Sequence, residues 1–434
     1  MIFTLEVLPA KEGDCLLLHW GKKDAPKLAV IDGGPSRVFE ETLAPRLEEI
    51  RTNRELEQLT IDITMVSHVD NDHVVGIDKL FRKLEKEVTA NLAPDRRTIA
   101  IRRLWHNTFN DIVGDATDAH YKSMTASFTA SVGDGAPNPD IETRIRAEAE
   151  QRLQMPPDDA DHLAHDISMV LAGHPQGRSL RNAHAVLRTN DSSIPKLNNP
   201  FKDGNGDAAL IMSGLGNPKV KVNGMQFHVV GPAKAQIDKL QADFDKFLET
   251  KGLSAEAVLA GYTDKSVPNL SSIVTMVEVD GKRILLTGDA RGDHIIKGLE
   301  AEGFLDEEPL KLDVLKVPHH GSDRNIDKDF FERLFAETYV FSADGKHGNP
   351  DRDTFEWLVE ARGKSAEYTV VLTYPIEHID AGRKEHFDSK GLDWKKPKHS
   401  LEAFFAECKA GGFRFKLLEA APQLIELGSE NIDW

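Results

Sequence analysis

The segment from Ser67 to Gly76 reads Ser-His-Val-Asp-Asn-Asp-His-Val-Val-Gly, and it constrains the fold more than any other part of the chain. Two imidazoles (His68, His73) and two carboxylates (Asp70, Asp72) lie between a predicted buried strand and a predicted helix. Without a cation, carboxylates held together raise each other's pKa. A divalent metal removes that repulsion, and His and Asp are suitable ligands for zinc, manganese or iron. A polar helix cap is the alternative interpretation, but a cap requires one acceptor rather than four metal-type ligands.

Predicted strands surround this cluster in the first part of the chain. Apolar runs and alternating apolar and polar residues predict strands at residues 3–8, 15–20, 27–31, 61–66 and 98–105. Helical spacing covers residues 36–60 and resumes from Val74 through Lys86. The cluster is therefore expected in a strand-to-helix loop, which can direct alternate side chains into one cavity.

The second half of the chain also alternates strands and helices. Asn223-Gly224 and Asp280-Gly281 are strong signals for two-residue hairpin turns between apolar segments. Further strands are predicted at residues 312–317, 339–342, 368–372, 413–417 and 424–427. We therefore expect an α/β fold with two facing mixed β-sheets and outer helices, rather than a single parallel sheet.

Residues 107–200 differ in character from the rest of the chain. They are polar, rich in Ala, Asp and His, and mostly helical in pattern. We interpret them as an insertion within a single domain that spans residues 1–434, suited to form a lid or a surface for a protein partner. Residues 365–434 are expected to supply C-terminal strands and a helix that complete the sandwich.

A second group of metal-type side chains lies more than two hundred residues after the first. Asp289 follows a predicted hairpin strand, and His319 and His320 follow the next strand. Asp289 is placed as a carboxylate that bridges two cations. If the backbone is extended, the two imidazoles point in opposite directions, so that one binds metal while the other contacts substrate or a second metal. A buried His pair bonded to carbonyl groups is the alternative interpretation, and it would be favoured if the pair stood alone. Because Asp289 and the first cluster are also present, we favour metal binding.

These segments resemble the metallo-β-lactamase superfamily, whose signature is His-x-His-x-Asp-His. This chain has His68-x-Asp70-x-Asp72-His73, a variant similar to the hydrolase domain of ComEC-like competence proteins and their free-standing relatives. Four further motifs are similar to the family's and occur in the same order: Glu12-Gly13-Asp14-Cys15, Ile31-Asp32-Gly33-Gly34, Leu286-Thr287-Gly288-Asp289 and His319-His320-Gly321-Ser322.

The resemblance implies a metallo-β-lactamase-type αββα sandwich with a metal site and a hydrolytic activity. It implies two divalent metal ions bound by His68, Asp70, Asp72, His73, Asp289, His319 and His320. Zinc is the first expectation, and the oxygen-rich ligand set makes manganese the second. The metals would activate a shared water as hydroxide. Asp72 and His320 are the expected catalytic residues: Asp72 orients the hydroxide, and His320 or His319 stabilises developing charge or protonates the leaving group.

The expected substrate is a phosphodiester, and the resemblance favours DNA or RNA. A net charge of −17 repels nucleic acid at long range. A small nucleotide or another small ester is therefore the alternative substrate. Arg96-Arg97 and Arg102-Arg103 form the densest basic patch, and we interpret it as a solvated surface. A non-catalytic metal-binding regulatory subunit of the same fold is a third hypothesis, which the presence of all the ligands disfavours.

The chain departs from the family pattern in two places. Asn269-Leu270-Ser271-Ser272 occupies the region where many lactamase-type enzymes have a histidine ligand, which implies that one metal is held less tightly. Gly348-Asn349-Pro350 replaces the Gly-His-Pro of ComEC-like proteins, with His347 nearby.

Several polar residues near these motifs receive structural interpretations. We expect turn chemistry for Asp14, orientation of a metal-bound histidine for Asp32, and structural roles for His106 and His228. The two cysteines, Cys15 and Cys408, are too few for a disulfide framework. The sequence has no signal-peptide pattern and no membrane span, so we expect a cytoplasmic protein with no membrane partner.

Overall fold

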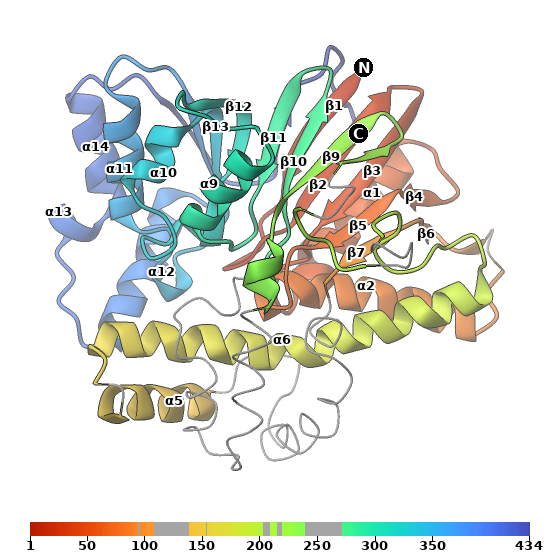
Figure 1. Cartoon of the computed structure of the whole chain (residues 1–434), viewed down its shortest axis with the longest axis horizontal. Coiled ribbons are helices and arrows are strands. Elements are labelled where there is room, and N and C mark those ends of the chain that lie inside the picture. Colours follow the sequence, from red (N-terminus) through yellow and green to blue (C-terminus); the bar gives the residue numbers. More distant parts are fainter. Residues whose placement is uncertain (94–95, 108–138, 153, 203–208, 215–218, 239–270) are drawn as a thin grey trace.

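The computed structural model describes residues 1–93, 96–107, 139–152, 154–202, 209–214, 219–238 and 271–434. Within them the chain forms a mixed α/β structure with two large sheets and one small sheet (Figure 1). Of the predicted insertion, residues 108–138 and 153 lie outside the described residues.

Six strands form the first sheet, in the order β16-β1-β2-β3-β5-β7. The pairs from β16 to β3 are antiparallel, whereas β3, β5 and β7 run parallel, so the sheet is mixed. The strand bounds are Ile2–Val7 (β1), Leu16–Lys22 (β2), Ala25–Ile31 (β3), Ile63–Val66 (β5), Leu104–His106 (β7) and Gln423–Glu426 (β16).

Eight strands form the second sheet, in the order β15-β14-β13-β12-β11-β10-β9-β8. The strands from β15 to β11 are parallel, and those from β11 to β8 are antiparallel. Their bounds are Lys219–Val222 (β8), Met225–Gly231 (β9), Val274–Val279 (β10), Lys282–Leu286 (β11), Leu310–Lys316 (β12), Leu334–Phe341 (β13), Thr369–Leu372 (β14) and Lys416–Glu419 (β15).

Both predicted hairpins are confirmed. Asn223 and Gly224 join β8 to β9, and Asp280 and Gly281 join β10 to β11. All four residues have positive φ, as the tight turns favoured between antiparallel strands require.

The two large sheets pack against each other, and helices cover their outer faces. One buried cluster joins the sheets, with Leu5 and Leu18 from the first and Phe227 and Val314 from the second. Along β11 the apolar side chains alternate, because Ile284 and Leu286 belong to this inner cluster while Leu285 belongs to the outer one. Strands buried on both faces therefore read as continuous apolar runs.

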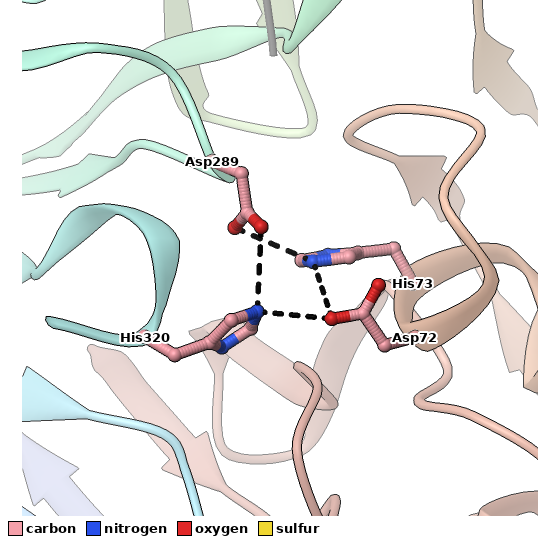
Figure 2. A group of neighbouring side chains, drawn as sticks. All are labelled: Asp72, His73, Asp289 and His320. Carbon is pink, nitrogen blue, oxygen red and sulfur yellow. Dashed lines mark hydrogen bonds and ion pairs between the residues drawn. The ribbon is translucent and has the colours of Figure 1, made fainter. Parts of the chain in front are cut away.

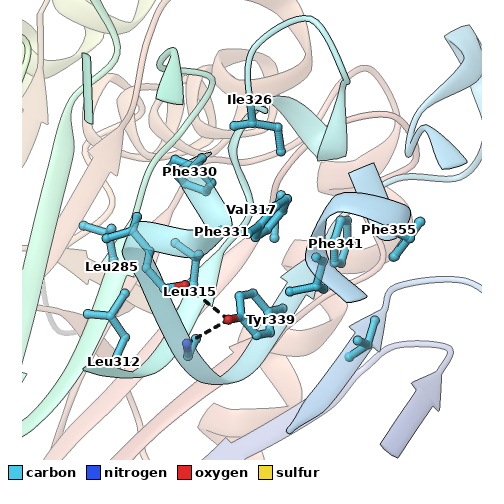
Figure 3. Packing of buried hydrophobic residues seen from close by; sticks show 14 of the residues in the cluster. Leu285, Leu312, Leu315, Val317, Ile326, Phe330, Phe331, Tyr339, Phe341 and Phe355 are labelled. Carbon is cyan, nitrogen blue, oxygen red and sulfur yellow. Dashed lines mark hydrogen bonds between the residues drawn. The ribbon is translucent and has the colours of Figure 1, made fainter. Parts of the chain in front are cut away.

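The outer cluster of the second sheet is rich in aromatic residues (Figure 3). Phe330 and Phe331 come from α10, and Phe355 comes from α11. The buried Tyr339 hydroxyl donates to the Leu334 carbonyl oxygen and accepts from the Ala336 N–H. The helices on this side are Gly292–Ala301 (α9), Lys328–Arg333 (α10), Arg352–Arg362 (α11), Ile376–Ser389 (α12), Lys396–His399 (α13) and Leu401–Ala410 (α14).

Two predicted strands are each divided in the structure. Residues 61–66 form β4 (Leu59–Ile61) and β5, and residues 98–105 form β6 (Ile99–Ile101) and β7. β4 and β6 pair in a separate two-stranded sheet. The division of the first strand falls at Asp62, whose carboxylate accepts from the Leu28 N–H and the Asn223 side chain.

Helices on the outer side of the first sheet include η1 (Phe39–Leu43), α1 (Ala44–Asn53) and α2 (Asn71–Thr89). The described part of residues 107–200, which we predicted to be an insertion, forms α5 (Pro139–Arg152) and α6 (Pro157–Asn190). The long α6 runs beneath both halves of the molecule, along α2 at one end (Figure 1). In the part of the chain that the structure describes, no helix combines the length and apolar character that a membrane span requires.

Candidate metal centre

The first ligand group lies where β5 gives way to α2. His68 follows β5, Asp70 is the N-cap of α2, and Asp72 and His73 lie in the helix's first turn. We expected all of these residues in a loop before the helix, and that expectation was wrong for Asp72 and His73. An acidic residue is favourable in this position because the amino end of a helix carries partial positive charge.

Asp289 comes to this loop through a close backbone approach. It follows β11, and the preceding Gly288 has φ of 49°. A Cβ at Gly288 would lie 2.9 Å from the Cβ of Ser67, so glycine allows the two segments to meet. The Asp289 N–H also donates to the Ser272 hydroxyl oxygen at 3.3 Å.

The two adjacent histidines lie in a short helical turn, η5 (Pro318–Gly321), rather than in extended chain. His319 and His320 have φ of 48° and 55°, and hydrogen bonds fix the turn, from the His319 N–H to the Gly288 oxygen and from the Ser322 N–H to the His319 oxygen. The two imidazoles were expected to point in opposite directions if the chain were extended; the chain is not extended here, and the left-handed backbone turns both toward Asp289.

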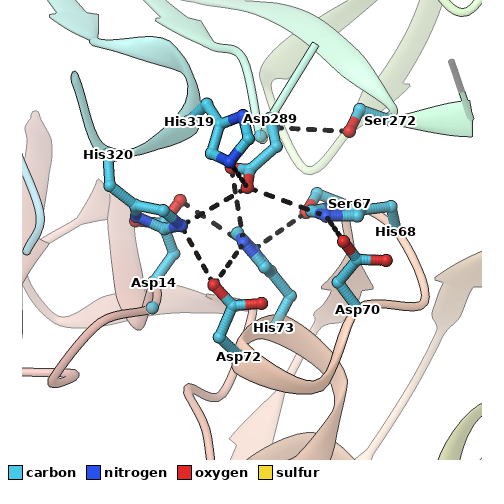
Figure 4. Close-up of polar contacts among 12 residues, drawn as sticks. Asp14, Ser67, His68, Asp70, Asp72, His73, Ser272, Asp289, His319 and His320 are labelled. Atoms are coloured by element: carbon cyan, nitrogen blue, oxygen red, sulfur yellow. Dashed lines mark hydrogen bonds and ion pairs between the residues drawn. The ribbon is translucent and has the colours of Figure 1, made fainter. Parts of the chain in front are cut away.

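All seven residues predicted as ligands come together, with the Asp289 carboxylate among four imidazoles (Figure 4). Figure 2 shows the inner group of Asp72, His73, Asp289 and His320. Oδ1 lies 3.3 Å from His73 Nε2, and Oδ2 lies 3.4 Å from His320 Nε2. The Nε2 atoms of His68 and His319 each lie 3.9 Å from Oδ2. The Asp289 carboxylate thus lies within 3.9 Å of all four imidazoles.

The other two carboxylates lie on either side of this centre. Asp72 Oδ2 is 3.1 Å from His320 Nε2 and 3.6 Å from His73 Nε2. Asp70 Oδ2 is 3.4 Å from His68 Nε2. Ligand atoms of Asp72, His73, Asp289 and His320 all lie within 4.8 Å of one another, which is close enough to share a metal ion.

Hydrogen bonds behind the cluster fix the protonation pattern of His73 and His68 (Figure 4). Asp32 Oδ2 lies 3.0 Å from His73 Nδ1 and can only accept when ionised, so Nδ1 carries the proton. The Ser67 hydroxyl donates to Asp32 Oδ2 at 2.8 Å, and its oxygen therefore accepts from His68 Nδ1 at 3.0 Å. Asp32 thus contacts His73 as predicted, and through Ser67 it also orients His68.

The third buried imidazole has the same pattern. His320 Nδ1 donates to the Ser342 carbonyl oxygen at 2.8 Å. All three imidazoles can therefore turn an unprotonated Nε2 toward Asp289, the tautomer that binds a metal ion.

Atoms that lack hydrogen bonds indicate that a cation fits this centre. His68 Nε2, His73 Nε2, Asp70 Oδ1 and Asp289 Oδ1 are buried and make no hydrogen bond within the described residues. Buried polar groups are nearly always paired, so four such atoms in one cluster require a partner. Because the donors are imidazole nitrogen and carboxylate oxygen, these side chains could hold a metal ion.

The pKa values point the same way. Burial disfavours ionisation of Asp289, yet His320 and His73 lower its pKa well below the usual range. Burial lowers the pKa of His73 and His320, but Asp289 and the other carboxylates raise both well above the ordinary value. The pKa of Asp72 falls to about 2 despite burial, because of His73 and His320. The carboxylates therefore create a strong local demand for positive charge.

Asp14 does not have the role in a turn that we expected. Its side chain is buried, and Oδ2 lies 2.6 Å from the buried ammonium group of Lys316. Asp14 Oδ1 lies 3.6 Å from His320 Nδ1. Sequence reasoning missed Lys316, although a lysine in the otherwise apolar Leu312–Val317 segment is the signal that could have found it. Asp14 and Asp32 also approach His73 Nδ1, but Asp14 pairs with Lys316, and Asp32 accepts hydrogen bonds from the Ser67 N–H and hydroxyl.

The remaining predicted neighbours lie outside the cluster of ligands. His106 is fully buried beside Gly177 of α6, and burial lowers its pKa to about 3. His228 is buried on β9 against Phe304. Asn269 lies outside the described residues, whereas Ser272 contacts Asp289 as noted above.

A cavity of about 400 Å³ lies over the ligand cluster. One wall of the cavity is formed by predicted metal ligands, namely Asp70, Asp72, Asp289, His319 and His320. Among these, the His319 side chain is 17% exposed, whereas that of His320 is 4% exposed. The remaining walls come from α6, from the segment after η5, and from η6 (Lys346–Gly348) with Asn349.

Comparisons with known proteins give short matches. No family model matches the chain. A segment covering 26% of this chain is 31% identical to 14% of ComE operon protein 3 of Bacillus subtilis (strain 168). Another, also 26% of this chain, is 30% identical to 4% of Microtubule-associated protein 1A of Mus musculus. The chain thus spans only a small part of these curated relatives. A solved structure of a protein of unknown function from Enterococcus faecalis V583 has a TM-score of 0.25 at 11% identity, covering 97% of this chain and 78% of that one.

Proposed function

We propose that this chain is a metallo-β-lactamase-type phosphodiesterase that uses two divalent cations. The observation that carries the proposal is the meeting of His68–His73 with Asp289 and the His319-His320 pair around one buried point. A chain without a metal has no evident reason to bury three carboxylates together beside four imidazoles.

The layer order and the motifs support this family. Two facing mixed sheets with outer helices are what the αββα architecture requires, and the metal-type side chains lie at the ends of β5, β11 and β12. The 31% identity to a segment of ComE operon protein 3 agrees with the ComEC-like form of the signature.

The ligands divide around Asp289. His68 and Asp70 would hold one cation and His73, Asp72 and His320 the other, with Asp289 shared between them. Zinc is the first choice and manganese the second, because the set is rich in oxygen. Bound divalent cations supply Lewis acidity, which lowers the pKa of water and offsets charge on a phosphoryl oxygen.

The side chains of the site would position the attacking water and the substrate and would transfer protons. Asp72 borders the cavity and can accept a hydrogen bond from the attacking water. His320 is held by the Ser342 carbonyl, and its Nε2 lies 3.1 Å from Asp72 Oδ2, as suits two side chains that would share one cation. The His319 side chain is 17% exposed and borders the cavity, with its Nε2 3.9 Å from Asp289 Oδ2, so it is the better group to contact the substrate phosphate or the leaving oxygen.

The test measures metal content and hydrolysis together. Purified protein is reconstituted with zinc or manganese and assayed with bis(p-nitrophenyl) phosphate, and bound metal is determined by elemental analysis. Asp72→Ala should lower kcat by at least about a hundredfold, as removal of a positioned catalytic group does. Asp24→Asn, in the exposed turn between β2 and β3, is the matched control and should retain full activity.

Each result has a distinct meaning. Activity that survives Asp72→Ala would reject the proposed mechanism. Stoichiometric metal without turnover of any phosphodiester would favour a hydrolase of another ester or a metal-binding regulatory subunit.

A further inference from the structure

We infer that the site takes a small phosphodiester of one or two nucleosides, because α6 covers the cavity that lies over the ligand cluster. This inference rests on the proposed function for the reaction, but not for the binding. The cavity volume of about 400 Å³ falls within the range of pockets that enclose small ligands.

The roof comes from the amino-terminal part of α6. Asp159, Leu163, His165 and Met169 line the cavity on the side facing the metal-type residues. Leu163 and Met169 are buried apolar side chains, so they offer a surface for the flat face of a base or another aromatic ring. A ligand with a phosphate at one end and an apolar ring at the other could place the phosphate at the metal-type residues and the ring against Leu163 and Met169.

The roof is attached firmly to both sides of the site. A Cβ at Gly173 would lie 1.8 Å from the Val69 oxygen, so the helix rests directly on the backbone of the first ligand loop. Arg324 Nη1, which follows η5, lies 2.9 Å from Asp159 Oδ1. The ring centroids of His165 and His347 are 4.0 Å apart, which joins α6 to η6. A polymer that approached from the α6 side would have to displace these contacts to reach Asp72.

The cations at the cavity are already paired. Arg291 Nε lies 2.9 Å from an Asp293 oxygen, and Lys346 pairs with Glu12. A polymer-binding protein instead needs a row of cations that follows the phosphates.

The densest basic patch lies at the far end of α6. The pKa of Asp191, which follows the helix, is lowered by its hydrogen bond from Ser193 and by Arg102 and Arg97. Asp159 lies at the other end of α6, and at about 1.5 Å per residue the two ends are roughly 45–50 Å apart. Together with the net charge of −17, this separation argues against a continuous nucleic-acid groove from that patch to the site.

The test compares matched small and large substrates. Zinc-loaded protein is assayed with the dinucleoside monophosphate dApdA and with circular single-stranded DNA, which has no end to insert. We expect kcat/KM per bond to be at least about tenfold higher for dApdA. Calorimetry with dAMP, a monoester that the reaction does not consume, measures binding separately.

Roof variants locate the binding. Leu163→Trp fills the cavity and should weaken dAMP binding about tenfold while the zinc content stays unchanged. Met169→Trp is the second variant if the first does not fold. Ala185→Trp, on an exposed position of the same helix, is the matched control and should bind dAMP as the wild type does.

The outcomes separate this inference from the proposed function. Equal hydrolysis of circular DNA and dApdA overturns the small-substrate inference and leaves the phosphodiesterase proposal standing. Binding of dAMP that depends on Leu163, without hydrolysis of any diester, supports the pocket and overturns the proposed function. Failure to bind dAMP, or binding that neither roof variant weakens, overturns the inference.

Discussion

Replacing Lys316 with methionine should lower the free energy of unfolding by about 3 kcal/mol, because it leaves Asp14 buried without its cation. The side chains of Lys316 and Asp14 are 1% and 2% exposed, and their charged atoms are 2.6 Å apart. Breaking a buried pair on one side costs about 3–5 kcal/mol. We expect the lower value because His320 Nδ1, 3.6 Å from Asp14, retains part of the compensation.

The assay is urea unfolding of metal-free protein, followed by tryptophan fluorescence, so that bound metal does not add stability of its own. The double variant Asp14→Asn/Lys316→Met removes both charges and should recover about 2 kcal/mol of the loss. Lys311→Met, at an exposed position on the same strand, is the control. The reasoning is refuted if Lys316→Met stays within about 1 kcal/mol of the wild type, or if the double variant is no more stable than the single one.

Three further predictions follow from contacts at and near the site. Asp289→Asn should abolish the gain in unfolding free energy that zinc gives the wild type, which is about 2.7 kcal/mol at a hundredfold excess over Kd; in thermal scans the Tm of the variant should then not rise with zinc. Gly173→Val should force α6 away from Val69, with a loss of about 1–3 kcal/mol of stability and about 10–100-fold in zinc affinity, measured by unfolding and by chelator competition. Burial and the neighbouring Asp323 raise the pKa of Asp351 to about 7. The folded state therefore binds the Asp351 proton more tightly than the unfolded state does, and the protein loses stability as the pH rises from about 4 to 7. Asp351→Asn should therefore raise Tm more at about pH 8 than at about pH 5, and an equal effect at both would contradict the assignment.

Features set by neighbouring residues were predictable from the sequence. The turns at Asn223-Gly224 and Asp280-Gly281 need positive φ, and these residue types adopt it readily, so both hairpins were predicted correctly. The capacity of the His68–His73 segment to bind a metal ion was also predictable, because it depends on the imidazole and carboxylate groups themselves and on their close spacing in the sequence.

Features set by distant contacts were not predictable in the same way. Asp14 looked like a turn residue because its partner, Lys316, lies on a strand in the other half of the chain. The directions of the His319 and His320 side chains depended on whether the backbone there is extended, and hydrogen bonds with Gly288 and Ser322 instead hold a left-handed turn. Nothing local in α6 shows that it roofs a cavity built by other segments.

The sequence by itself determined which side chains could bind a cation, since that depends on functional groups and short spacings. Only the tertiary structure decided that Asp72 and His320, separated by 248 positions, lie 3.1 Å apart. It also decided which imidazole nitrogens face inward, because Asp32, Ser67 and Ser342 select the tautomers from behind. The physical reason is that the close packing of two sheets and their helices fixes the distances between these side chains, whereas the sequence pattern specifies only which functional groups are available.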